Sequence, residues 1–306
     1  MLRFLTHRGA YALITFFVVV SAVFFMLRAA PGGPFDGERR LPPEIEANLL
    51  AAYDLDAPLY EQYLNFWRKL LKGDLGPSFT AKDFSVNALV ATGLPVSAGL
   101  GLAALIMALV VGMGIGICAG LHPGSRLDTS LMAISNINIA IPVIVTAPLM
   151  ALVFAVVLSW LPAGGSGSLE HYVLPSIALA LPYAAAIARL MRAGVAEAAT
   201  EPHVKTARAK GLGPARIVTR HILPIASVPL ISFLGPAAAG LLTGSVVVEQ
   251  VFDLPGIGRY FVQGALNRDY TLVMGVVIIY AGAILLFNLL VDLVYGLVDP
   301  RIRLTR

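Results

Sequence analysis

One basic segment stands out among the residues that could take part in chemistry. Residues 203–224 read HVKTARAKGLGPARIVTRHILP and hold five cationic side chains and no acid, although only 13% of the chain is charged. The five are Lys205, Arg208, Lys210, Arg216 and Arg220. Cations at this density bind anionic lipid, phosphate or an acidic protein surface. The segment therefore predicts contact with a partner protein or with anionic lipid.

The sequence contains none of the familiar catalytic motifs. It has no G-x-x-x-x-G-K-[ST] nucleotide loop, no H-E-x-x-H or C-x-x-C pair and no G-x-S-x-G turn. Cys118 is the sole cysteine, which excludes an intrachain disulfide. A membrane-embedded enzyme cannot be assembled from these residues. We therefore predict that this chain is not an enzyme and holds no cofactor or metal of its own.

The elements that must position the basic segment are six long apolar blocks. Hydrophobic residues make up 58% of the chain, above the roughly 45–50% of soluble domains. A membrane-spanning helix needs about 20 apolar residues. Blocks of that length are 9–28, 95–120, 130–158, 172–195, 225–250 and 271–297. The first holds 18 uncharged residues, longer than the roughly 7–15 of a secretion signal, so we expect it to be retained. The predicted fold class is an all-α polytopic membrane protein with six spans.

Acidic residues are scarce in these blocks. Asp292 lies inside the sixth block, and Glu249 lies at the outer end of the fifth. An ion-coupled transporter usually buries more charge along its pathway. We therefore expect Asp292 to pair with an arginine or with the backbone of a neighbouring helix rather than to relay protons.

The distribution of Lys and Arg predicts that both termini are cytoplasmic. In that orientation the cytoplasmic ends and loops hold 13 basic and four acidic residues, and the opposite side holds nine basic and 13 acidic residues. The basic segment then lies on the cytoplasmic face.

Residues 29–94 are predicted to form a small extracytoplasmic cap between a first unit, 1–28, and a membrane core, 95–306. The cap begins with the turn-rich stretch APGGPFDGERRLPPE and continues with amphipathic helices at 44–53 and 59–72. Its apolar stripe consists of Tyr53, Leu59, Tyr60, Tyr63, Phe66, Trp67 and Leu70. We expect these side chains to pack on one another or at the lipid interface rather than to form a ligand cage.

Small and polar residues within the blocks predict how the spans pack. Gly112, Gly116 and Gly120 repeat every four residues and should let another helix approach closely, and Gly240 and Gly244 repeat the pattern in the fifth block. Amides and prolines occur together in the third block, at Asn136, Asn138, Pro142 and Pro148. They fit either hydrogen bonds between helices or a water-filled path. Candidates for such a path are Asn136, Asn138, Thr146, Ser232, Thr243 and Ser245.

The basic segment is predicted to form two short helices joined at a glycine. His203 to Lys210 contains good helix formers, Gly211 suits the residue after a helix C-cap, and Pro214 starts a second helix that runs to about residue 222. Pro224 marks the entry into the fifth block. Small side chains occur at Thr206, Ala207 and Ala209. We expect the first helix to sit in a groove on a partner, and contact with anionic lipid is the alternative.

The spacing in this segment resembles the cytoplasmic loop of the membrane subunits of ABC-type importers. That loop carries Glu-Ala-Ala, three residues, Gly, nine residues, and then a hydrophobic residue shortly before Leu-Pro. Gly211 and Leu223-Pro224 stand at matching positions, whereas Lys205-Thr206-Ala207 replaces the Glu-Ala-Ala triplet. The literal Glu197-Ala198-Ala199 is 11 residues from Gly211 and does not fit. TARAKGL at 206–212 is similar to the peptide-importer branch, where the first two triplet residues commonly differ.

Further motifs extend the resemblance along nearly the whole chain. RAAPGGPFDGERRLPPE, YDLDAPLYEQY, KGDLGPSF, LPGIG, GALNRDY and VDPRIR are similar, in matching order, to the B subunits of oligopeptide permeases. The resemblance implies the six-helix type I ABC importer permease fold in a bacterial inner membrane. It also implies a homologous second permease subunit, two cytoplasmic ATPases that hold ATP and Mg, and an extracytoplasmic peptide-binding protein. Transport would occur by alternating access.

The resemblance further implies that the loop 197–224 couples the chain to an ATPase. The residues expected to do so are Lys205, Thr206, Ala207, Arg208, Ala209, Lys210, Gly211, Leu212, Leu223 and Pro224. The predicted substrate is an oligopeptide. A dipeptide or nickel importer of the same family is one alternative, and an ion-coupled peptide carrier is an alternative from a different class.

Overall fold

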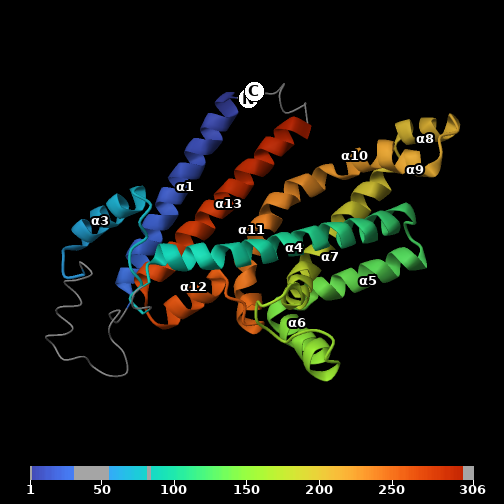
Figure 1. Ribbon diagram of the computed structural model, residues 1–306. Coiled ribbons are helices and arrows are strands. Elements are labelled where there is room, and N and C mark those ends of the chain that lie inside the picture. The colour runs from blue at the N-terminus through green and yellow to red at the C-terminus, as the bar shows by residue number, and fades with distance from the viewer. Residues whose placement is uncertain (1, 31–54, 81–83, 299–306) are drawn as a thin grey trace.

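The computed structural model describes residues 2–30, 55–80 and 84–298, and every named element in these ranges is a helix (Figure 1). Five helices there are long and apolar enough to cross a membrane. They are α1 (Leu2–Ala29), α4 (Val86–Leu121), α7 (Val173–Ala198), α11 (Val228–Val251) and α13 (Tyr270–Val298). These five match the first, second, fourth, fifth and sixth predicted spans. The start of α4 falls inside the range 29–94 that is predicted for the cap.

The third predicted span, 130–158, is not one continuous helix. It is divided into α5 (Arg126–Ala140) and a second segment formed by α6 (Val143–Met150) and the π-helix η1 (Ala151–Val157), with a bend of 101° between them. Pro142 causes the break, because it has no backbone N–H and disfavours helical backbone at the residue before it. Ile141 is accordingly extended, with φ −92° and ψ 117°. If this bent pair counts as one span, the described residues provide six spans.

The glycine repeat of α4 packs directly against α7, as predicted. A Cβ at Gly112 would lie 2.6 Å from Ala184 O, and a Cβ at Gly116 would lie 2.6 Å from Ala188 O. Gly120 approaches the backbone of α7 in the same way one turn later. The two helices therefore touch backbone to backbone over about two turns, which only glycine permits.

The second glycine pair does not work in this way. A Cβ at Gly240 would collide with the hydroxyl of Tyr183, and one at Gly244 would make only an ordinary contact, 3.9 Å from a leucine methyl group. The prediction that Gly240 and Gly244 repeat the helix-packing device is therefore wrong. Gly240 instead leaves space for a tyrosine side chain.

Within the range predicted for the cap, the helix α3 (Leu59–Leu71) lies against α1. Trp67 stacks on Phe17 with ring centroids 5.1 Å apart, and the Tyr63 and Ser21 hydroxyls lie 2.7 Å apart. Phe66 and Leu70 pack in the same cluster, whereas Leu59 and Tyr60 are exposed. The predicted packing of these aromatics is thus confirmed for Tyr63, Phe66 and Trp67. Tyr53 and the predicted helix 44–53 lie outside the described residues.

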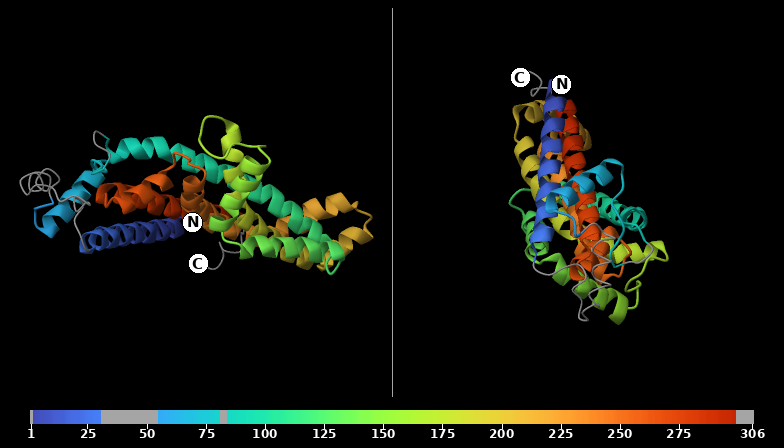
Figure 2. Two further views of the ribbon diagram at one scale, coloured as in Figure 1. Left: turned by 90° about the horizontal axis from the view of Figure 1, so that it is seen from below. Right: turned by 90° about the vertical axis from the view of Figure 1, so that its left-hand side faces the viewer.

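Short elements gather at two opposite ends of the bundle (Figures 1 and 2). At one end α8 (Pro202–Ala209) and α9 (Pro214–Ile217) project beyond the long helices. At the other end lie α3 and α12 (Ile257–Leu266), of which the sequence analysis predicts only α3. We call these the α8 end and the α12 end.

Candidate functional site

The loop at the α8 end has the predicted helix–glycine–helix form. Pro202 occupies the first position of α8, Lys210 is its C-cap, and Gly211 follows with φ +75°. The Gly211 N–H donates to Arg208 O at 2.9 Å, and the Leu212 N–H donates to Ala207 O at 3.2 Å. This pair of hydrogen bonds is a Schellman motif, in which a left-handed residue ends the helix. Gly211 and Leu212 therefore lie just beyond the helix rather than inside it.

The two faces of α8 differ in chemistry. Val204 and Ala207 are buried in the apolar cluster that also contains Ile217 and Ile222, because α8 packs on α9 and on the π-helix η3 (Val218–Ile222). The outward face presents Lys205, Thr206, Arg208, Ala209 and Lys210, all of which are exposed. Ala207 is only 4% exposed, so the expectation that it belongs to a small-residue face for a partner is wrong. It instead lets α8 lie close to its own support.

The second half of the loop leads without a break into the membrane core. Leu212 and Leu223 are half-buried against the main apolar cluster. Pro224 sits in the first turn of α10 (Leu223–Ala226) and has no N–H to donate back to the preceding turn, which coincides with the π-helical geometry of η3. A Cβ at Gly194 on α7 would lie 2.7 Å from Ala226 O, so α10 rests directly on α7.

An ion pair braces the α8 end next to this loop. Arg192 on α7 makes two hydrogen bonds to Asp128 on α5, from Nη2 to Oδ2 at 2.7 Å and from Nε to Oδ1 at 3.1 Å. The Asp128 side chain is 5% exposed and also accepts from the Gly124 N–H. This pair is not predicted from the sequence. Asp128 lies in the first turn of α5, just before the third apolar block, and belongs to no recognised motif.

The polar residues predicted for a path make their hydrogen bonds mainly within their own helices. Four of them bond to their own helix, as when Asn138 Nδ2 donates to Ile134 O at 2.9 Å. The others that do so are Thr146, Thr243 and Ser245. Asn136 and Ser232 are exposed, whereas Ser245 has no exposed surface in this conformation. These contacts are helix-internal, so a role in transport stays a prediction.

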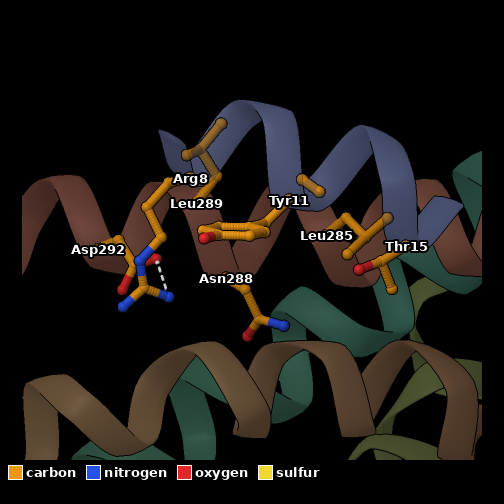
Figure 3. A pocket seen from close by; sticks show the side chains of 8 residues that line it. Arg8, Tyr11, Thr15, Leu285, Asn288, Leu289 and Asp292 are labelled. Carbon is orange, nitrogen blue, oxygen red and sulfur yellow. Dashed lines mark ion pairs between the residues drawn. The ribbon is translucent and has the colours of Figure 1, made fainter. Parts of the chain in front are cut away.

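Asp292 pairs with an arginine on a neighbouring helix, as expected. Arg8 Nη1 on α1 lies 3.0 Å from Asp292 Oδ2 on α13. The pair borders a groove of about 470 Å³ between the two helices, which is also lined by Tyr11, Thr15 and Asn288 (Figure 3). The ion pair joins the start of α1 to the end of α13.

At the α12 end, the structure reveals two fully buried carboxylates, Glu249 and Asp269. Glu249 bonds to the first turn of α12, and Asp269 bonds to the residues that follow α3 and to the first turn of α13. In the sequence, the LPGIG motif that follows Glu249 is the only signal for the Glu249 site. Ser97 on α4, which bonds to Glu249, is 152 residues away. Among the described residues, no three His, Cys, Asp or Glu side chains form a group that could hold a metal ion.

Comparison with known proteins shows that the sequence is similar to those of transport proteins. The family described as binding-protein-dependent transport system inner membrane component matches residues 112–304. The oligopeptide transport system permease protein OppB of Escherichia coli strain K12 is 46% identical over 305 residues, which cover 99% of this chain and 100% of OppB. The dipeptide transport system permease protein DppB of Bacillus subtilis strain 168 is 39% identical over 304 residues, or 99% of each chain.

Solved structures share the fold at lower identity. A chain of the inward-facing MetNI methionine ABC transporter superposes with a TM-score of 0.59 and 21% identity, over 69% of this chain and 96% of that one. A chain of an amino acid ABC transporter with histidines gives a TM-score of 0.55 and 20% identity, over 69% and 94% of the two chains. These two likenesses concern the fold alone.

Proposed function

This chain belongs to the family of inner membrane components of binding-protein-dependent transport systems, and on that premise we propose that it is the permease subunit of an ATP-driven oligopeptide importer. It forms half of a translocation path that alternates in access between the two sides of a bacterial inner membrane. The proposal that the substrate is an oligopeptide rests on the identity of 46% to OppB. The matched region covers 99% of this chain and all of OppB.

Coupling to ATP hydrolysis takes place, in this proposal, through the outward face of α8. That face stands clear of the bundle, carries Lys205, Arg208 and Lys210, and is held at a fixed angle by the Schellman motif at Gly211. A rigid, exposed, basic helix suits a groove on a cytoplasmic ATPase subunit better than a loose contact with lipid, because lipid contact requires no defined backbone geometry. ATP and Mg are bound by the ATPase subunits, not by this chain.

The remaining partners follow from the same premise. A homologous second permease subunit completes the path, two ATPase subunits bind at the α8 end, and an extracytoplasmic peptide-binding protein delivers peptide to the α12 end. Both termini lie on the cytoplasmic side. This orientation agrees with the excess of basic residues predicted there and with α8, which is the most basic exposed element at its end.

Reconstitution tests this function directly. The chain is co-expressed with a second permease subunit and two ATPase subunits, purified as a complex and placed in liposomes that carry the peptide-binding protein on the outer side. We expect a labelled peptide of four or five residues to accumulate inside only when ATP is present in the lumen, where the ATPases of outward-oriented complexes lie. Accumulation driven by a proton gradient without ATP would instead identify an ion-coupled carrier.

The second candidate is a dipeptide importer, and the 39% identity to DppB supports it. The same liposomes distinguish the two, because labelled dipeptide and labelled pentapeptide compete for one path. Preferential uptake of the dipeptide would replace the oligopeptide assignment while leaving the family unchanged.

A further inference from the structure

Glu249 is a buried carboxylate that neither the coupling loop nor the predicted path uses. It lies near the end of α11 with no exposed surface. Its Oε1 accepts from Ser97 Oγ on α4 at 2.7 Å, and its Oε2 accepts from the backbone N–H groups of Gly258 at 2.8 Å and Arg259 at 3.3 Å. A carboxylate satisfied in this way at an apolar site is held by the structure, and it also holds the groups that donate to it.

The two backbone N–H groups that donate to Glu249 belong to the first turn of α12. A helix begins with backbone N–H groups that have no partner inside the helix, and a side chain at the N-cap usually accepts from one of them. Gly256 is the N-cap of α12 and has no side chain to do this. Instead Ser97 Oγ accepts from the Ile257 N–H at 2.9 Å, and Glu249 accepts from the next two. The N-terminus of α12 is therefore capped by side chains of α4 and α11, with a negative charge at the positive end of the helix dipole.

The two glycines of the LPGIG motif leave room for this arrangement. A Cβ at Gly256 would collide with the Glu249 carboxylate and would lie 2.6 Å from Ser97 Oγ. A Cβ at Gly258 would lie 2.6 Å from Val246 Cα on α11. Backbone, serine and carboxylate thus meet without space for any further side chain.

The other end of α12 is fixed as firmly. The Asp269 N–H donates to Gly264 O at 2.8 Å, and the Asp269 carboxylate accepts from Ser78 Oγ at 2.5 Å and from the Leu272 N–H at 3.0 Å. At its start α12 also packs on α4, where a Cβ at Gly93 would lie 3.0 Å from Ile257 N. Elements that open and close alone have few buried contacts and mobile ends, and α12 has neither property.

We propose that Glu249 is a positioning residue that joins α4, α11 and α12 into one rigid body, so that α12 moves together with these helices during transport and is not a separately hinged lid. The inference rests on the proposed transport function, because it concerns motion within a transport cycle. It assigns to Glu249 a mechanical role at the α12 end, opposite the coupling loop.

The experiment compares three forms of the reconstituted complex, each on a background in which Cys118 is replaced by Ser. Glu249→Ala removes the acceptor and is expected to lower peptide transport at least about tenfold, since two backbone donors of α12 and the Ser97 hydroxyl lose their partner. Glu249→Gln keeps an oxygen for the two N–H groups and an N–H for Ser97 Oγ, so we expect transport within about threefold of the parent.

The third form replaces the hydrogen bonds by a covalent link. Glu249→Ala removes the carboxylate that would obstruct a side chain at Gly256, so Ser97→Cys and Gly256→Cys can be added to it. The Cβ position of residue 256 lies within disulfide reach of the atom at Ser97 Oγ. Oxidation of this triple variant is expected to restore transport to at least half of the parent rate, and reductant is expected to remove the gain.

Two results would overturn the inference. One is a Glu249→Ala complex that transports at the parent rate. The other is a triple variant that assembles in normal amounts and forms the disulfide completely but is inactive when oxidised, because this would show that α12 must separate from α4 during transport. Failure of the proposed function is a distinct outcome, since the parent complex itself would then not import peptide.

Discussion

Replacement of Gly211 by Val is expected to disconnect the coupling loop while leaving the membrane helices in place. Gly211 has φ +75°, and no atom beyond its own chain neighbours lies within 4 Å of the position that a Cβ would take. The obstacle to a side chain is therefore backbone conformation and not crowding. An L-residue in the left-handed region costs about 1–2 kcal/mol, and a β-branched residue is a marked outlier there.

The penalty can be bracketed from the hydrogen bonds of the motif. If the Val variant keeps the loop, it carries the conformational cost of about 1–2 kcal/mol. If the chain escapes to a right-handed conformation, it loses the bonds from the Gly211 and Leu212 N–H groups, each a net contribution of about 0.5–1.5 kcal/mol. Either route costs about 1–3 kcal/mol, which lowers the population of the docking-competent loop by about 5- to 150-fold.

The assay measures ATPase subunits that copurify with the tagged chain, together with peptide uptake by the liposomes. We expect normal amounts of the chain in the membrane, because insertion depends on hydrophobicity and charge placement that this change leaves alone. Two controls isolate the backbone effect. Gly211→Asn adds a larger polar side chain that tolerates left-handed backbone, and Gly213→Val adds the same side chain where φ is −67° and space is open. Both should retain coupling.

The reasoning would be refuted by the opposite pattern of variants. Lys205 is exposed, and truncation of one surface charge typically costs about 0–1 kcal/mol, so Lys205→Ala is expected to be mild. If Gly211→Val transports normally while Lys205→Ala abolishes transport, the segment supplies charge rather than docking geometry.

Three further changes test the helix packing, the topology and the backbone strain at Arg268. Gly116→Ala should destabilise the purified chain by about 1–3 kcal/mol in thermal unfolding, because its Cβ would lie 2.6 Å from an α7 carbonyl oxygen. The control Gly114→Ala places its Cβ where nothing lies within 4 Å, so it should be neutral or stabilising. Equal effects of the two changes would contradict the α4–α7 packing. Cysteines placed at Lys72 and at Thr219, both exposed positions, should react with an impermeant reagent from opposite sides of the membrane, and reaction from one side would contradict the proposed topology. Arg268→Gly should raise the unfolding temperature by relieving a φ of +55°, worth about 1–2 kcal/mol, and a lower temperature would show that the Arg side chain is needed.

The coupling loop could be predicted from sequence because its geometry is set locally. Pro202, Gly211 and Pro214 each impose a backbone conformation on their own neighbourhood, and all three act where a short-range rule places them. The inward direction of Ala207 could not be predicted in the same way. Whether a small residue faces a partner or its own support depends on where α9 and η3 lie, and that is a tertiary property.

The third span and α12 show where hydropathy fails. Residues 130–158 are apolar throughout, and apolarity alone does not distinguish a straight helix from two segments bent by 101°. Pro142 was the sequence signal for the bend, but a proline within a membrane helix is often tolerated without a break. The helix α12 is short and follows a glycine-rich turn, and its N-terminus is capped from other helices, so it has no local start signal. Ser97 and Glu249 are 152 residues apart, a distance over which no single-sequence pattern connects them.

A continuous series of close contacts links the α8 end of the bundle to the α12 end. The helix α8 packs on η3, which continues into α10, and α10 touches α7 backbone to backbone at Gly194. The helix α7 in turn meets α4 along the glycine ridge. The helix α4 holds α12 through Ser97, which also bonds to Glu249 on α11. At each glycine contact no side chain lies between the backbones, so little adaptable material is available to absorb a displacement. Motion applied at α8 would therefore reach α12 as rotation of a rigid unit rather than as local repacking. The disulfide between positions 97 and 256 tests the step of this series from α4 to α12.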